Sequence, residues 1–218
     1  MAVNMNSDSY KIQWGNVNMG GGRKTSAGYI VTDTLGQIAP GDYQSAGYWL
    51  RAGFQYIHTI IPFTFTISDL NIAFGSLVVG TPSTDTNTLT VSARGAGGYQ
   101  VLAFENHPLK SRQANDIADT LCDTSLCDET NADPWTNNSV YGFGFNMSGD
   151  DIPVDFVDST YFRQFADLES AESKQIVMSS DAVTSSSTAT VTYKVNVSAV
   201  QEAGNYENAI TYVAVPGY

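Results

Sequence analysis

Residues 191–197 read Val191-Thr192-Tyr193-Lys194-Val195-Asn196-Val197, a strict alternation of apolar and polar side chains. Such period-two patterning predicts a β-strand with one face on a core and the other face in water. The same alternation recurs in residues 61–67, 89–93 and 141–147. Residues 209–215 are apolar more continuously, which favours a central strand buried on both faces. Together these stretches predict an all-β protein with antiparallel strands.

The composition agrees with a strand-rich fold of one or two domains. The chain has 218 residues, enough to bury a sizeable core. Only 15 % of the residues are charged, against about 25 % in typical globular domains. Val, Ile, Thr, Tyr and Phe, which favour strands, are abundant. We therefore expect a β-sandwich domain over residues 54–218.

The first 53 residues carry a repeat. Ser-x-x-Tyr occurs at residues 7–10, 26–29 and 45–48, so that its tyrosines recur every 19 residues. A fixed period marks a repeated structural unit, here a strand plus a turn. Three short strands bury little by themselves and need a pairing partner. That partner is either the sandwich of the same chain, with which residues 1–53 would share one packed structure, or a neighbouring subunit.

Two stretches interrupt the strand pattern. Residues 106–139 are polar and acidic, and they predict one long acidic loop inserted in the sandwich. Residues 160–175 carry apolar residues at a spacing compatible with a short helix. Long loops on compact domains are often functional, so the acidic insertion is a place to look for a site.

The net charge of −12 restricts the classes of partner. An acidic surface repels nucleic acid and anionic lipid, so we expect neither nucleic-acid binding nor membrane insertion. No stretch is apolar enough for a transmembrane helix. The start, Met1 to Asn4, lacks the basic and apolar parts of a signal peptide, and we expect mature numbering after removal of a leader.

Cys122 and Cys127, the only cysteines, are separated by four residues. A single close pair predicts a disulfide in an exported protein, and hence an extracellular or cell-surface location. The closed loop is so short that the expected gain in chain entropy is about 2 kcal/mol. A two-thiol metal site is the alternative, although the second ligand pair of a zinc site is missing.

Calcium is the expected cofactor, if there is one. Its candidate ligands are Asp150, Asp151, Asp155 and Asp158, because calcium takes six to eight oxygens from carboxylates and backbone carbonyls. The insertion holds a second acidic group between Asp116 and Asp133. Neither group has EF-hand spacing, and solvated acidic loops are the plainer interpretation of both.

Glycans are a further class of expected partner. Trp135, in the acidic insertion, is a candidate platform for stacking on a sugar, provided that its ring is exposed. Three Asn-x-Ser sequons, at Asn137, Asn146 and Asn196, are candidate glycosylation sites, and Asn196 is expected on the accessible face of its strand.

Nothing in the sequence indicates catalysis. The chain has two histidines, His58 and His107, and neither belongs to a catalytic motif. A nucleophile elbow, a P-loop, a dinucleotide fingerprint and a His-Glu-x-x-His motif are all missing. We therefore expect a protein that is not an enzyme.

Self-assembly is the remaining class of function. An exposed sheet edge is a template for strand addition, and an open head-to-tail contact produces filaments. The first repeat offers an extended segment whose candidate assembly residues are Tyr10, Ile12, Trp14 and Val17. Either this segment extends into a neighbour's sheet, which gives a homopolymer, or it completes the sheet of its own chain.

Several short motifs resemble a group of secreted bacterial and archaeal surface proteins. They include Phe74-Gly-Ser-Leu77, Tyr141-Gly-Phe-Gly-Phe145, the strand at 191–198, then Ala203-Gly-Asn-Tyr206 and the strand at 210–212. This ending is similar to that of camelysin-type matrix fibre proteins and of some extracellular tube and pilus subunits. The resemblance implies a jelly-roll-like antiparallel β-sandwich that donates a terminal strand to the next subunit, sometimes with calcium near the joint.

The leading expectation is therefore a structural subunit of an extracellular filament, tube or surface layer that assembles head-to-tail by β-strand complementation. The alternative is a secreted or surface-tethered β-sandwich module that binds carbohydrate or calcium.

Overall fold

The computed structural model describes residues 5–6, 11–12, 20–25, 30–36, 41–45, 48–53, 62–95 and 97–217. The chain divides into two compact units, Met1–Ile61 and Pro62–Tyr218, which we call the hairpin unit and the core unit. The division falls after Ile61, eight residues beyond the boundary expected after residue 53, and the expected packing of the two parts into one structure stays a prediction. Every regular element in the described ranges is a β-strand, and every strand pair is antiparallel.

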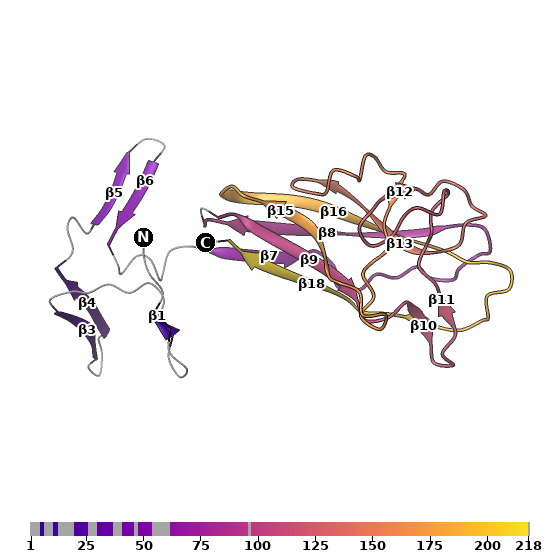
Figure 1. Cartoon of the computed structure of the whole chain (residues 1–218), viewed down its shortest axis with the longest axis horizontal. Coiled ribbons are helices and arrows are strands. Elements are labelled where there is room, and N and C mark those ends of the chain that lie inside the picture. The colour runs from indigo at the N-terminus through magenta and orange to yellow at the C-terminus, as the bar shows by residue number, and fades with distance from the viewer. Residues whose placement is uncertain are drawn as a thin grey trace. The chain divides into compact units, whose positions relative to one another are not determined.

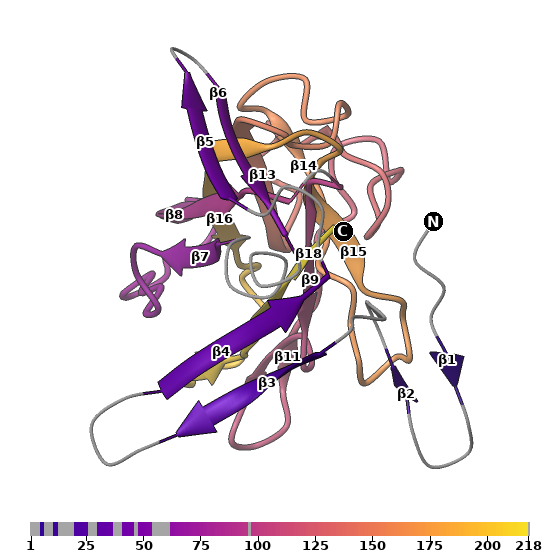
Figure 2. The same cartoon turned by 90° about the vertical axis from the view of Figure 1, so that its left-hand side faces the viewer.

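The hairpin unit consists of two-stranded hairpins, one for each copy of the repeat (Figure 2). In each hairpin the Ser-x-x-Tyr motif falls between or at the ends of the two paired strands, so each copy of the repeat comes with two strands and not with one. The pairs are β1 (Met5–Asn6) with β2 (Lys11–Ile12), β3 (Gly20–Thr25) with β4 (Ile30–Leu35), and β5 (Gly41–Ser45) with β6 (Tyr48–Ala52).

The core unit is built on two larger sheets (Figure 1). The four-stranded sheet has the order β13 (Gly142–Gly149), β16 (Thr184–Asn196), β8 (Ser83–Ala93) and β7 (Phe63–Ile67). The three-stranded sheet has the order β15 (Gln175–Ser180), β9 (Tyr99–Glu105) and β18 (Ile210–Pro216). The smaller pairings join β11 (Asp116–Ile117), β10 (Leu109–Ser111) and β17 (Tyr206–Glu207), and join β12 (Asp133–Pro134) to β14 (Tyr161–Phe162).

Both larger sheets contribute to one buried apolar cluster. The alternation predicted for residues 191–197 is confirmed on this side, since Val191, Tyr193 and Val195 are all buried. Phe165 stacks on the ring of Phe145 with a centroid distance of 4.1 Å. Other members are Leu89 and Val91 of β8, Val101 of β9, Phe143 and Met147 of β13, and Met178 of β15. This cluster is the core that the period-two pattern requires.

The opposite face of β13 and β16 does not face water as predicted. Lys194, Asn146 and Asn196 are buried there, because residues 118–140 and 158–166 cover this face. Two glycines let the covering backbone approach. A Cβ on Gly144 would lie 2.7 Å from the carbonyl oxygen of Arg163, and one on Gly142 would lie 2.7 Å from the backbone of Thr120.

The two stretches that lacked a strand pattern are ordered by contacts with distant strands. The predicted helix over residues 160–175 is wrong, because Arg163 and Phe145 exchange two backbone hydrogen bonds of 2.8 and 2.9 Å that tie this stretch to β13. The acidic insertion is not a single long loop, since it contains β10, β11 and β12. Long-range pairing therefore determines both segments, which is why local patterning missed it.

Candidate functional site

Strand β18 lies at an edge of its sheet, where the sequence predicts a central strand. Among the described residues it pairs only with β9, from Ile210 opposite Glu105 to Pro216 opposite Tyr99. In Figure 1 this yellow strand follows the lower margin of the core unit. The strand is uncharged, and its seven residues pair without a shift in register.

The free side of β18 presents backbone groups that no described residue pairs with. The carbonyl of Ala209 accepts from the N–H of Asn106, and Gly217 donates to the carbonyl of Gly98, so the odd-numbered residues of this segment hydrogen-bond to β9. The N–H and C=O groups of Ile210, Tyr212 and Ala214 therefore point away from β9. Such a row of donors and acceptors is a template for another strand.

A groove of about 930 Å³ lies between β18 and the four-stranded sheet. Ile67 of β7 and Ile210 and Tyr212 of β18 line it, together with the segments 69–79 and 198–209. Several apolar side chains beside it are exposed, including Leu70 at 85 % and Val200 at 89 %. Exposed apolar residues gathered around a groove are typical of an interaction surface.

Two tyrosines bridge the sheets inside the groove. The hydroxyls of Tyr193 and Tyr212 lie 2.8 Å apart, and the Tyr193 hydroxyl donates to Asn87 at 3.3 Å. Burial raises the pKa of both phenols, so both remain neutral donors. The groove therefore carries both apolar and polar side chains, and a hydrogen bond between two tyrosine hydroxyls joins β16 to β18 inside it.

A buried pair of carboxyl groups lies behind one wall of the groove. The side chain of Glu105, at the end of β9, is 0 % exposed, and one oxygen of Glu105 and one oxygen of Asp119 are buried without a hydrogen-bond partner among the described residues. Burial, followed by the charge of Asp119, raises the pKa of Glu105 to about 10. Burial also raises the pKa of Asp119 to about 7. Ionisation of both carboxyls is therefore disfavoured in the folded chain, most strongly at Glu105.

Other segments converge on this pair. Asn208, in the groove wall, donates to Glu105 at 2.6 Å. The carboxylates of Asp167 and Glu172 face the pair and also disfavour its ionisation. Sequence reasoning missed this site because residues 105, 119, 167 and 208 are far apart along the chain.

The four aspartates proposed as calcium ligands are each engaged separately. The carboxylate of Asp150 accepts from the N–H of Thr188, and that of Asp158 accepts from Thr160. Asp151 accepts from the hydroxyls of Tyr99 at 2.8 Å and Ser187 at 2.6 Å. Asp155 forms an ion pair with Arg163. The described residues contain no group of three or more His, Cys, Asp or Glu side chains placed to hold a metal.

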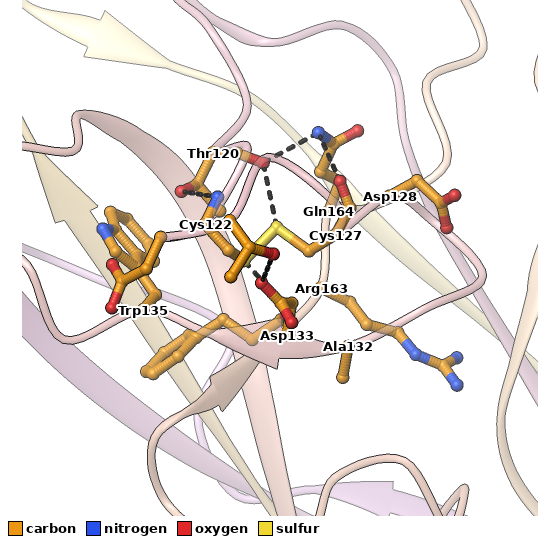
Figure 3. The surroundings of a disulfide bond; sticks show 12 residues. Thr120, Cys122, Cys127, Asp128, Ala132, Asp133, Trp135, Arg163 and Gln164 are labelled. Carbon is orange, nitrogen blue, oxygen red and sulfur yellow. Dashed lines mark hydrogen bonds between the residues drawn. A yellow bond between two sulfur atoms is a disulfide. The ribbon is translucent and has the colours of Figure 1, made fainter.

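The predicted disulfide between Cys122 and Cys127 is present. Both cysteines are buried in a second small core with Trp135 and Phe162, whose rings meet edge-on at 5.4 Å. Figure 3 shows the disulfide with the side chain of Gln164, which donates to the carbonyl of Thr120. The bond therefore belongs to the layer that covers β13 and β16.

Trp135 does not have the exposed ring that a glycan platform needs. Its side chain is 1 % exposed, and the ammonium group of Lys194 lies 4.3 Å from the ring centroid. The same ammonium donates to the carbonyl of Trp135 at 2.6 Å, and burial lowers the pKa of Lys194. A lysine and an asparagine on one strand face suggest a polar contact, and this much could be seen in the sequence. The groups that they contact lie far away along the chain, so the sequence could not identify them.

Two of the three sequons are buried. Asn196 is 1 % exposed and donates to the carbonyls of Asn138 and Val140, which overturns its expected accessibility. Asn146 is buried and donates to the carbonyls of Asp158 and Tyr161. Asn137 is exposed and remains the accessible sequon.

Of the proposed assembly residues, Ile12 lies in β2, opposite Met5. Tyr10, Trp14 and Val17 lie outside the described residues. Their predicted role in assembly therefore stays a prediction.

Comparisons with protein families, with curated proteins and with solved structures gave no significant match. In the part of the chain that the structure describes, no helix is long and apolar enough to cross a membrane.

Proposed function

We propose that this protein is a structural subunit of an extracellular filament, tube or surface layer, assembling head-to-tail by β-strand complementation. We also propose that its two larger sheets pack face to face as a jelly-roll-like sandwich, and their shared apolar cluster supports this arrangement. The role is not enzymatic, and the partner is another copy of the same chain.

One observation carries the proposal. The hairpin unit consists of separate two-stranded hairpins, and no described strand joins them into a larger sheet. A lone two-stranded hairpin is marginally stable in water and needs a further strand or a packing surface. A unit made of such hairpins is suited to pairing with another surface.

The disulfide supports the proposed location. Bonds of this kind form and persist in oxidising compartments, as on cell surfaces. Asn137 is the accessible sequon, and it would carry a glycan only in a host that glycosylates its exported proteins.

Electron microscopy and light scattering of the purified full chain test the proposal. We expect regular filaments or tubes, and we expect that deletion of residues 1–24 abolishes them while the far-ultraviolet circular dichroism of the core unit is retained. Monodisperse monomers of the full chain at all concentrations would contradict the proposal and favour the carbohydrate- or calcium-binding alternative.

A further inference from the structure

We propose that the side of the core unit bounded by β7 and β18 accepts a single β-strand from the hairpin unit of a second copy of this chain. This inference rests on the proposed function and assigns the acceptor to a particular pair of strand edges.

The first step is a mismatch between the sequence of β18 and its position. Residues 210–216 read Ile-Thr-Tyr-Val-Ala-Val-Pro, the composition of a strand with neighbours on both sides, yet the described residues provide a neighbour on one side only. A second strand along the free side gives this sequence the environment that it matches.

The second step is that the other outer edges of these sheets are protected. Strand β15 has a bulge between Ile176 and Met178, and β13 is covered by the segment containing Arg163. Bulges and covering segments are ways in which proteins block strand addition. By contrast, β7 and β18 pair with their neighbours without a shift in register.

The third step is incomplete burial on this side. The core-facing residues of the inner strands, such as Val91 and Val195, are fully buried. Those of the two edges are only partly buried although they pack on the same cluster: Phe63, Phe65, Ile67, Ile210, Tyr212 and Ala214. An added strand covers these residues and also satisfies the outward backbone groups of β18.

The fourth step identifies the occupant by charge. The hairpin unit has four Lys or Arg residues against three Asp or Glu, whereas the core unit has six against nineteen. Asp69, Glu202 and Glu207 line the groove, and none of the described lining residues is Lys or Arg. The acidic core unit therefore repels a second core unit and attracts a hairpin unit.

Two substitutions in β18 test the acceptor in the full chain. Ala214→Pro removes an outward N–H without removing a bond to β9, and Val215→Lys puts a charge on a side chain that is 46 % exposed. Each is expected to weaken self-association at least tenfold, measured by light scattering against concentration. The control Val183→Lys adds the same charge at a residue that is 55 % exposed in the turn before β16, and it should assemble like the parent.

Thermal unfolding of each variant separates a blocked edge from a damaged fold. A variant that unfolds like the parent but no longer associates supports the acceptor. If Ala214→Pro is unstable, Val215→Lys decides alone. Normal assembly of a folded Val215→Lys variant would overturn the acceptor at β18 while leaving the filament proposal intact, whereas failure of the parent to assemble sinks the proposed function itself.

Cross-linking identifies the occupant. Chains carrying Thr211→Cys are mixed with chains carrying Ile12→Cys, Thr32→Cys or Leu50→Cys, one in each hairpin, with Val183→Cys as the control acceptor. A disulfide-linked dimer with Thr211→Cys, and not with the control, supports a second copy. A cross-link that forms only when both cysteines are in one chain would show that the chain completes its own sheet, and this overturns the proposal.

Discussion

The carboxyl pair of Glu105 and Asp119 links protonation to folding. In the folded chain their pKa values are raised to about 10 and about 7, whereas free carboxyls titrate near pH 4. Between these limits the folded state binds more protons than the unfolded state, so stability falls as the pH rises. The contribution of the pair is fully present below about pH 4 and is lost as the pH rises through 7 towards 10.

We expect Glu105→Gln to flatten this pH dependence. The amide keeps an acceptor for Asn208 and stays neutral at every pH, so the variant should lose less stability than the parent between pH 5 and pH 8. Each raised pKa contributes a slope of up to about 1.4 kcal/mol per pH unit. The measurement is the midpoint of thermal unfolding at a series of pH values.

The matched control is Asp181→Asn, which removes one exposed carboxylate and should leave the slope unchanged. An equally steep slope in Glu105→Gln would show that the pair is not its source.

Three exposed or half-buried aspartates have the opposite effect on the pH dependence of stability. Hydrogen bonds from Thr136, Thr130 and Thr160 hold the pKa values of Asp123, Asp128 and Asp158 below their usual range, against the opposing effect of burial at Asp123 and Asp128. Their contribution is present above the pKa of the unfolded carboxyls and is lost in acid. In acid, these three aspartates therefore lose their contribution to stability while the Glu105 pair retains its own.

At the scale of elements, the covering of β13 and β16 by residues 118–140 and 158–166 depends on close backbone contact. Gly144→Ala would place a Cβ 2.7 Å from the carbonyl oxygen of Arg163, which cannot move without disturbing its pairing with Phe145. We expect a loss of about 1–3 kcal/mol in the free energy of unfolding, measured with chemical denaturant. Gly204→Ala, whose Cβ would meet nothing nearer than 3.5 Å, should have little effect.

The disulfide stabilises the same layer. Replacing both Cys122 and Cys127 with alanine should lower the free energy of unfolding by about 2 kcal/mol, the chain-entropy value for so short a loop. Chemical denaturation with and without reductant measures this. Reductant should destabilise the parent and leave the double variant unchanged, and an effect of reductant on both would point to another cause.

The sequence predicted the inward faces of the strands because burial on one side of a strand leaves a local, period-two record. The sequence could not predict that the outer face is covered. Lys194 and Asn196 are polar, and polar residues suit that face whether it contacts water or the carbonyls of Trp135 and Val140. Glu105 and Asp119 come together only through tertiary pairing. The apolar sequence of β18 predicted a central strand, and this prediction is wrong for the described residues, which place the strand at an edge.

At the scale of the whole molecule, charge is divided between the two units. A hairpin unit with a small positive excess and a strongly acidic core unit attract each other over distances set by ionic strength. We expect the rate of assembly to fall as salt rises from low values to about 1 M, where the Debye length is about 3 Å. Light scattering against time measures the rate, and a rate independent of salt would contradict this role of charge.

The regular pairing of β18 with β9 also decides how the molecule responds to mechanical load. The two strands are registered over seven consecutive residues, with Ile210 at one end and Pro216 at the other. A pull along β18 loads all these pairs at once in shear, whereas a pull across the strand would open them one at a time like a zipper. If neighbouring copies are joined along this strand, tension in the fibre would run along it. The contact between copies would then resist force because its strand pairs are loaded in shear, as well as through its binding affinity.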